Sequence, residues 1–282
     1  RLLADHRDEI NGTVDFFFQT GEEGYFGAKV AIEEGLFDPP HSPDAVFALH
    51  ISPLLPIGKV TGRAGPLLAA ADFWELEIVG KGGHASMPHD ALDPIPVACD
   101  IVQAFNTFVT RRINAFDPVV LTTTKIEAGT TSNVIPESAH LMGTLRSTSE
   151  RARKTAHDGL ERIARQIAAA HEMDARMTIN YGYPVTVNEA GFVEFARNVA
   201  TDLLGDQGFI EMKSPMMGAE DFSYFLHRWP GAMFFLGVKP DDESLAAPCH
   251  SNRMMLNEDG MAHGVALHAE IALRWLREQT AA

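Results

Sequence analysis

The chain has 282 residues, of which 45% are hydrophobic, so it is long enough for one large domain or two smaller ones with packed cores. Its formal net charge of -15 excludes the basic surface that nucleic-acid binding requires, and no apolar run reaches the length of a membrane span. We therefore expect a cytoplasmic protein with no nucleic-acid or membrane partner. Cys99 and Cys249 are expected to be free thiols, because nothing indicates an oxidising compartment.

The first part of the chain shows the pattern of an open α/β sheet. We expect a helix over residues 1–10, a buried strand over 14–19 (VDFFFQ), a helix over 25–36 and a second buried strand over 45–50 (AVFALH). Short apolar runs of this kind are typical of parallel strands that are buried on both faces. A strand, a helix and a strand in succession indicate a βαβ unit.

The pattern changes at about Gly62. Residues 72–79 (DFWELEIV) alternate between apolar and charged side chains, which predicts a half-exposed antiparallel strand. Ser147 and Glu150 form a capping box at the start of a helix with Leu160 and Ile163 on its apolar face. The other elements expected here are a helix over 91–113 and strands over 119–126, 139–146 and 176–181. Together they predict a small sheet with two helices.

The α/β pattern returns after Pro184. A helix is marked by Phe192, Phe195 and Val199, a buried strand by residues 232–236 (AMFFL), and a last helix runs from about Glu258. The predicted fold is therefore α/β: a mostly parallel-sheet domain carries the catalytic and metal-binding residues, and an α+β domain is inserted into it. The predicted boundaries are 1–61 and 184–282 for the first domain and 62–183 for the inserted one.

Two adjacent carboxylates, Glu22 and Glu23, lie between Gly21 and Gly24 directly after the first expected strand. Ligands of open α/β sheets bind beyond the carboxyl ends of strands. Adjacent like charges that are buried need a nearby cation or a raised pKa. One carboxylate can ligate a metal while the other acts on a water molecule; a solvated acidic turn is the alternative.

Several other side chains are candidates on similar grounds. His50 ends the second expected strand and His250 follows the last one. A neutral imidazole at either place can ligate zinc, manganese, cobalt or nickel, although a hydrogen-bonded core histidine is the alternative for His50. His84 is presented by a glycine-rich turn, from which it can donate to an oxyanion or simply face water. Asn133 and Arg146 are suited to a substrate carboxylate, or are a turn residue and a surface charge. The acidic pair Glu220 and Asp221 is interpreted as the N-terminal acids of a helix.

The order of the motifs is more specific than any of them alone. The succession QTGEEG, ALHISP, GKGGHASMPH, TTSNVIPESAHLMGTLRS, MGAEDFSYF and PCHSNRM resembles the amidohydrolase branch of the aminoacylase-like and carboxypeptidase G-like metallopeptidases. Hippurate hydrolases, auxin-conjugate hydrolases and N-acyl-L-amino acid amidohydrolases belong to that branch. The resemblance covers essentially the whole chain and implies a zinc-exopeptidase-like catalytic domain with an inserted dimerisation lid.

The resemblance also implies roles for individual residues. Glu22 matches the general base, and Glu23, His50 and His250 match metal ligands. His84 matches the histidine that stabilises the oxyanion in the active site of the partner subunit. Residues near the substrate carboxylate are matched by Asn133 and Arg146. The expected protein is thus a homodimeric hydrolase of N-acyl amino acids, a metallo-amidohydrolase acting on linear amides with two divalent metals per subunit (Zn, Mn, Co or Ni).

One family motif is absent from these residues. It is a Cys-Gly-His-Asp stretch just upstream of the position of Arg1, and it supplies a cysteine and a histidine to the two-metal site. We therefore expect the chain by itself to bind metal poorly and to hydrolyse slowly. Two alternatives remain: an inactive or truncated homologue that dimerises or binds acyl-amino acids without turnover, and a dipeptidase of the same superfamily.

Overall fold

The chain forms two units, each with its own sheet and hydrophobic core, in a computed structural model that describes residues 1–281. Unit 1 comprises Arg1–Leu67, Val187–Pro215 and Asp221–Ala282, and unit 2 comprises Leu68–Thr186 and Met216–Glu220. None of the described helices is long and apolar enough to cross a membrane. Each unit is considered by itself below.

Unit 1 contains a four-stranded, mostly parallel sheet in the order β1-β12-β2-β11. β1 (Val46–Ser52) pairs in parallel with β12 (Gly231–Gly237), and β2 (Val60–Gly62) runs parallel to β11 (Phe209–Glu211) but antiparallel to β12. Every residue of β12 is buried, as expected for a central strand with covered faces. The strands predicted over 45–50 and 232–236 are confirmed, as is the mixed α/β class.

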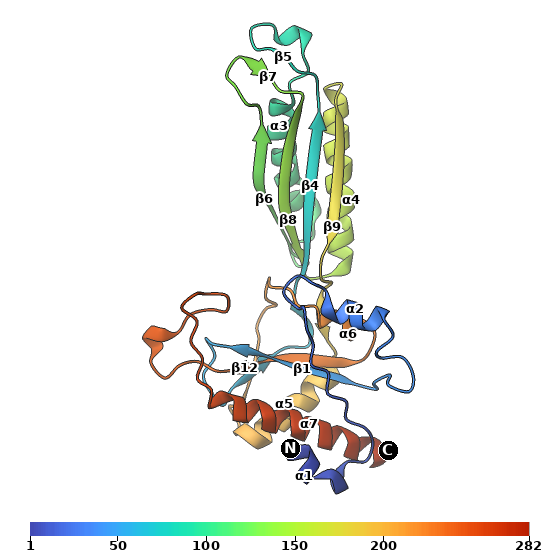
Figure 1. Ribbon diagram of the computed structural model, residues 1–282, viewed down its shortest axis with the longest axis vertical. Helices are drawn as coiled ribbons and strands as arrows, with labels where there is room; N and C mark the ends of the chain where they lie inside the picture. The colour runs from blue at the N-terminus through green and yellow to red at the C-terminus, as the bar shows by residue number, and fades with distance from the viewer. Residues whose placement is uncertain (282) are drawn as a thin grey trace. The chain divides into compact units, whose positions relative to one another are not determined.

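Helices cover both faces of this sheet (Figure 1). Phe47 of β1 packs in a cluster with Phe234 and with residues of α5 (Ala190–Leu204) and α7 (Gly260–Ala281). Its neighbour Val46 points to the other face, where it packs in a cluster of residues from α2 (Gly27–Glu33) and the α6 (Ser223–Leu226) region. Because side chains alternate along a strand, His50 lies on the same face of β1 as Val46.

The strand predicted over 14–19 is wrong. This segment forms no sheet ladder, and the side chains of Phe16 and Phe18 are 67% and 87% exposed. The ring of Phe17 packs edge-on against Phe37 and Phe225, with centroids 5.1 and 5.5 Å apart. An apolar run is a buried strand only when another strand pairs with it, and among the described residues β1 pairs with β12 alone.

Local signals also misplaced some helix ends. The helix predicted over 1–10 is shorter, and the helix predicted over 25–36 begins only after Phe26, whose φ of 57° is left-handed. The capping box was placed two residues too early, because Ser147 belongs to a strand. Ser149 is the N-cap of the helix, and its side chain accepts the N–H of Ala152 at 3.0 Å.

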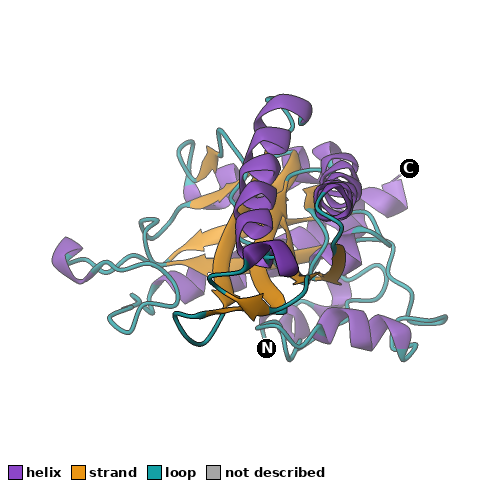
Figure 2. Ribbon diagram, turned by 90° about the horizontal axis from the view of Figure 1, so that it is seen from above, coloured by secondary structure: helices purple, strands orange, loops and turns teal. Residues whose placement is uncertain are grey.

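Unit 2 is an antiparallel sheet in the order β6-β8-β4-β9 with two helices on one face (Figures 1 and 2). Trp74, Phe105 and Leu160 form part of the core between sheet and helices. The alternation predicted over 72–79 is confirmed, because Trp74 and Leu76 are buried while Phe73 is exposed. The main elements are β4 (Ala70–Val79), α3 (Pro94–Arg112), β6 (Val119–Ala128), β8 (Ser138–Ser147), α4 (Glu150–Ala170) and β9 (Asp174–Tyr181).

The remaining elements are short and were not expected from the sequence, apart from the start of the first helix. A run of two to four residues has too little periodicity to be recognised. These elements are α1 (Leu2–Asp5), η1 (Arg7–Glu9), β3 (Gly65–Leu68), β5 (Gly83–His84), η2 (Pro88–Asp90), β7 (Val134–Ile135), β10 (Thr186–Asn188) and η3 (Glu243–Leu245). β5 pairs with β7, and β3 pairs with β10.

Candidate metal and catalytic site

The two adjacent glutamates lie in a tight turn that leads into α2. Gly21 and Gly24 have φ of 75° and 84°, backbone angles that residues other than glycine rarely adopt. A Cβ on Gly27 would lie 1.6 Å from the carbonyl oxygen of Thr20, so glycine is also required there. The backbone therefore turns tightly both before and after Glu22 and Glu23. Glu22 is half-buried and Glu23 is exposed.

Burial raises the pKa of the Glu22 carboxyl, and the negative charges of Glu23 and Asp221 raise it further. The positive charge of His250 opposes the shift. Glu22 and Asp221 have carboxylate oxygens within 4.8 Å of one another. A half-buried carboxyl among other carboxylates holds a proton more readily than one in water, a property expected of a general base that later acts as an acid.

Asp221 is the site residue that sequence reasoning missed. It comes directly before Phe222, the N-cap of the short helix α6. Its side chain is fully buried, and its Oδ2 accepts the backbone N–H of Ala28, 193 residues away, at 2.9 Å. Oδ1 accepts a hydrogen bond from the side-chain amide of Gln19. The acidic MGAED motif was the only signal for Asp221 in the sequence. It did not identify Gln19 and Ala28 as the hydrogen-bond partners of this residue.

His50 lies near the carboxyl end of β1, on the strand face shared with Val46. Its Nδ1 lies 2.6 Å from the carbonyl oxygen of Ile51, to which it donates a hydrogen bond. The imidazole also packs against Phe235, with ring centroids 5.5 Å apart. A proton on Nδ1 leaves the lone pair of Nε2 available, which is the tautomer that a metal-ligating histidine needs.

The loop that carries His250 lies close to both His50 and Glu23. Nε2 of His250 is 3.7 Å from a carboxylate oxygen of Glu23, and both side chains are largely exposed. Sγ of Cys249 lies 3.9 Å from the carbonyl oxygen of Ile51, the acceptor of His50. Burial and the charge of Glu23 raise the pKa of the Cys249 thiol. Unit 1 therefore brings the three predicted ligands into one neighbourhood.

Within the described part of the chain, the three predicted ligands do not form a compact donor set. Glu23 and His250 lie side by side, but the donor atoms of Glu23, His50 and His250 do not all come within 4.8 Å of one another. Carboxylate oxygen and imidazole nitrogen are nevertheless the donor types that divalent zinc, manganese, cobalt and nickel accept. The ligand assignment therefore stays a prediction.

His84 belongs to unit 2, where β5 presents it opposite Val134 of β7. Its Nδ1 accepts the backbone N–H of Ser86 at 3.2 Å and lies 2.7 Å from the Ser86 hydroxyl. An Nδ1 that accepts leaves the proton on Nε2, so the exposed ring is a hydrogen-bond donor. Asn133 is exposed. It lies close to His84, because its backbone carbonyl oxygen accepts the N–H of Ala85 at 3.0 Å.

Arg146 lies on β8, on the sheet face opposite the buried Leu145. It is half-buried, and burial lowers the pKa of its guanidinium although the charge of Asp72 opposes the shift. No hydrogen bond or ion pair joins Arg146 to another residue that the structure describes. A half-buried cation without an anionic partner favours binding of a carboxylate.

Asn133 and Arg146 were predicted to hold the same substrate carboxylate, and the structure keeps them apart. Asn133 precedes β8 (Ser138–Ser147), and Arg146 is at the other end of this ten-residue strand. At about 3.4 Å per residue, the two side chains are separated by roughly 30 Å along the sheet. In one copy of unit 2, a small substrate contacts one of them and not both.

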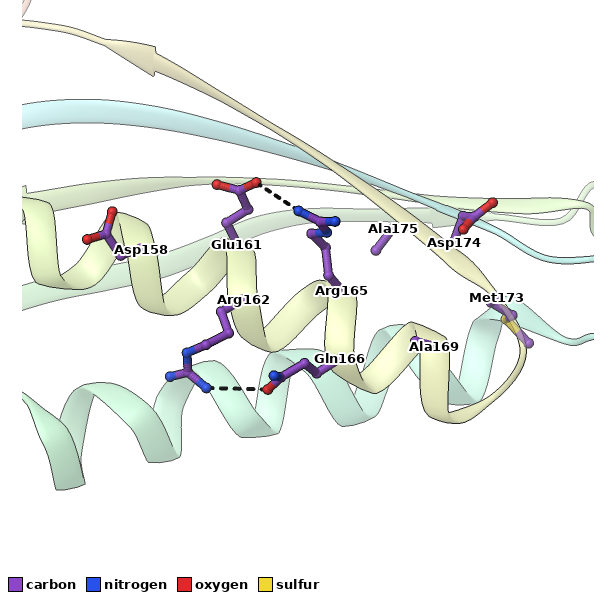
Figure 3. A pocket seen from close by; sticks show the side chains of 9 residues that line it. All are labelled: Asp158, Glu161, Arg162, Arg165, Gln166, Ala169, Met173, Asp174 and Ala175. Carbon is purple, nitrogen blue, oxygen red and sulfur yellow. Dashed lines mark hydrogen bonds and ion pairs between the residues drawn. The ribbon is translucent and has the colours of Figure 1, made fainter.

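Unit 2 also has a surface depression along α4 and β9, shown in Figure 3. Two of its charged side chains form an ion pair, since Arg165 lies 3.6 Å from Glu161, and Arg162 donates to the neutral amide of Gln166 at 3.4 Å. None of the predicted site residues lines this depression.

Comparison with known proteins shows which family has this architecture. A solved Bacillus subtilis structure, described as a dinuclear metal-binding peptidase from the M20 family, superposes with a TM-score of 0.81; it is 29% identical and covers 98% of this chain and 68% of its own. The model of Peptidase family M20/M25/M40 matches residues 1–274. This chain is therefore a member of Peptidase family M20/M25/M40.

Two curated relatives are similar over nearly the whole chain. IAA-amino acid hydrolase ILR1-like 4 of Arabidopsis thaliana is 35% identical over 99% of this chain. Thermostable carboxypeptidase 2 of Saccharolobus solfataricus is 34% identical over 97% of it. The chain spans 63% of the length of the plant relative and 69% of the archaeal one.

Proposed function

We propose that this protein hydrolyses the amide bond of N-acyl amino acids in a metal-dependent reaction. The observation that carries the proposal is the neighbourhood of Glu22, Glu23, His50 and His250 in unit 1, with the half-buried Glu22 beside a carboxylate and imidazole pair. Family membership and the names of the relatives, an amino-acid conjugate hydrolase and a carboxypeptidase, support the same reaction class.

The donor set fits a divalent metal. Glu23 and His250 would hold it together with His50, whose Nδ1 hydrogen bond to Ile51 leaves Nε2 free to ligate. We propose zinc, manganese, cobalt or nickel, with two ions per subunit. Three ligands are too few for two four-coordinate ions, so we propose that these residues by themselves bind metal weakly and support slow turnover.

The proposed chemistry assigns a task to each residue. A bound divalent ion supplies the positive charge that lowers the pKa of a water molecule to about 7 and polarises the scissile carbonyl. Glu22 accepts the proton of the attacking water and returns it to the amine nitrogen as the C–N bond breaks. Nε2–H of His84 donates to the developing oxyanion, and Arg146 binds the carboxylate of the amino acid.

We propose a homodimer joined through unit 2. The separation of roughly 30 Å between the ends of β8 supports this arrangement, because His84 and Asn133 at one end cannot serve the same small substrate as Arg146 at the other. In a dimer, one copy would supply Arg146 to an active site and the second copy would supply His84 with Asn133.

The test measures release of free amino acid from N-acetyl and N-benzoyl amino acids by the full chain with added zinc or manganese, beside a dipeptide panel. We expect slow, chelator-sensitive hydrolysis that the isosteric Glu22→Gln abolishes and the exposed control Glu34→Gln preserves. Preference for unblocked dipeptides would instead identify a dipeptidase. Hydrolysis that persists in Glu22→Gln, or after complete removal of metal, would overturn the proposal.

A homologue that binds acyl-amino acids without cutting them is the second candidate, and the small number of ligands favours it. Metal content measured by elemental analysis separates the two. A chain that binds N-acetyl amino acids with no bound metal and no turnover is a binding protein. A chain whose turnover rises with metal occupancy is a hydrolase.

A further inference from the structure

Asp221 occupies an unusual position in unit 1. Its side chain is a fully buried carboxyl group, and it comes directly before the four-residue helix α6. Buried carboxylates are rare in proteins unless hydrogen bonds or a cation compensate for the lost water. The compensation here comes from the segment that contains the two adjacent glutamates.

Both oxygens of Asp221 bind that segment, one on each side of the glutamates. Oδ1 accepts a hydrogen bond from the Gln19 side chain, before the turn, and Oδ2 accepts the N–H of Ala28 at 2.9 Å, after it. The backbone of Asp221 also forms a hydrogen bond with the carboxylate of Glu22. One residue thus contacts the beginning, the middle and the end of segment 19–28.

The backbone hydrogen bonds within the segment are local, since the N–H groups of Tyr25 and Gly27 both donate to the carbonyl oxygen of Gly21. The segment belongs to no sheet ladder, and the N-cap of α2, Phe26, has no side chain that can accept a hydrogen bond. Its glycines lower the steric cost of the turn but raise the conformational entropy lost when it becomes ordered. Hydrogen bonds to a carboxylate are stronger than those to a neutral acceptor, which makes a buried carboxylate an effective support.

We propose that Asp221 is a positioning residue for the proposed reaction: its carboxylate fixes the turn at both ends and thereby sets where Glu22 and Glu23 are presented. The inference rests on the proposed function, because it assumes that Glu22 moves the proton and that Glu23 ligates. It adds a residue outside the set that touches metal or substrate. A displacement of a catalytic group by about 1 Å costs on the order of a hundredfold in rate, so the position of this turn matters.

The experiment compares Asp221→Ala, which removes both acceptors, with Asp221→Asn. An asparagine keeps one oxygen for Ala28 and offers an amide to Gln19, whose own amide can rotate to accept it. Asp93→Ala is the matched control: Asp93 likewise accepts a backbone N–H near the start of a helix, that of Ile95 at 3.0 Å, but in unit 2. Each full-length variant is studied by amide hydrogen exchange, manganese titration and hydrolysis of N-acetyl amino acids.

In Asp221→Ala we expect at least tenfold faster exchange in a peptide covering residues 19–29, with exchange in β12 unchanged. We also expect weaker manganese binding and a fall in kcat on the order of a hundredfold with little change in KM. Asp221→Asn should restore exchange, manganese affinity and most of kcat, because it restores the geometry without the charge. Asp93→Ala should leave all three unchanged.

Several results would overturn the inference. Unchanged exchange over 19–29 in Asp221→Ala would show that the carboxylate does not hold the turn. Faster exchange with normal manganese affinity and kcat would show that the position of the turn does not matter. If Asp221→Asn loses as much manganese affinity and kcat as Asp221→Ala, the charge of Asp221 acts directly on the reaction. In that case the residue does not act by positioning the turn. If no variant hydrolyses any substrate, the proposed function fails, while exchange and manganese titration still decide the role of Asp221.

Discussion

His50 donates its Nδ1 hydrogen to the carbonyl oxygen of Ile51 at 2.6 Å, so that the lone pair of Nε2 remains available. His84 has the opposite arrangement, because its Nδ1 accepts from Ser86 and its Nε2 keeps the proton. The backbone thus prepares one histidine to ligate and the other to donate. This difference gives each a distinct expected phenotype.

Replacing His50 by glutamine should reduce the affinity for divalent metal by at least about tenfold, since it removes a ligand that the backbone has already oriented. Competition with a fluorescent chelator measures this affinity. The matched control is His140→Gln, which changes an exposed histidine of unit 2 that has no assigned role. Equal affinities in the two variants would remove His50 from the proposed ligand set.

Replacing His84 by alanine should lower kcat by about 10²–10³, the usual cost of losing one oxyanion donor. If a second copy supplies His84, mixing this variant with Glu22→Gln will regain activity, because one site of each mixed dimer keeps both residues. Random exchange of subunits predicts about a quarter of the native activity. A mixture no more active than its two components would exclude a shared site.

Replacing Arg146 by methionine should raise KM for N-acyl amino acids by roughly 10–150-fold, the value of a hydrogen bond to a charged group, with a smaller effect on kcat. A substrate whose carboxylate is converted to a carboxamide should bind weakly to the native protein and be unaffected by the substitution. Steady-state kinetics of both proteins with both substrates form a double-mutant cycle. Additive effects would indicate that Arg146 binds some other group.

Asp72 offers a test of stability in unit 2. Its carboxylate is buried and binds the buried Arg153 guanidinium through both oxygens, with Nε to Oδ2 at 2.8 Å and Nη2 to Oδ1 at 2.5 Å. Nε2 of His157 also lies 2.8 Å from Oδ2. Burial alone would raise the pKa of Asp72, but the hydrogen bonds and charge of Arg153 outweigh it, and the pKa is lowered.

A lowered folded-state pKa means that this stabilisation is complete above the unfolded pKa of about 3.9 and is lost as the pH falls through the folded value. At pH 7, Asp72→Asn should therefore reduce the free energy of unfolding by up to about 3 kcal/mol, since it removes the buried anion beside Arg153. Glu150, whose carboxylate lies 3.1 Å from Nη1 of Arg153, still compensates part of the charge. The difference from the native protein should narrow below about pH 4. Urea denaturation at both pH values measures it, and a constant difference would contradict the linkage.

Much of the architecture could be predicted because its signals are local. The alternation over 72–79 and the apolar run over 232–236 each report the periodicity of one strand, and both strands are present. The run over 14–19 looked equivalent, but a strand also needs a neighbour, and no local pattern shows whether one is there. The short strands β3, β5, β7 and β10 were missed for a related reason, because their pairing partners cannot be recognised from the local sequence.

The sequence by itself determined the family, the α/β class and the residue types of the candidate site, because motif order and periodicity are properties of the chain alone. Only the tertiary structure decided that Asp221 binds Ala28 across 193 residues, that Ile51 selects the tautomer of His50, and that Asn133 and Arg146 lie at opposite ends of β8. These are relations between groups far apart in sequence or between a side chain and the fold around it. Burial, hydrogen-bond partners and strand register exist only once the chain has packed.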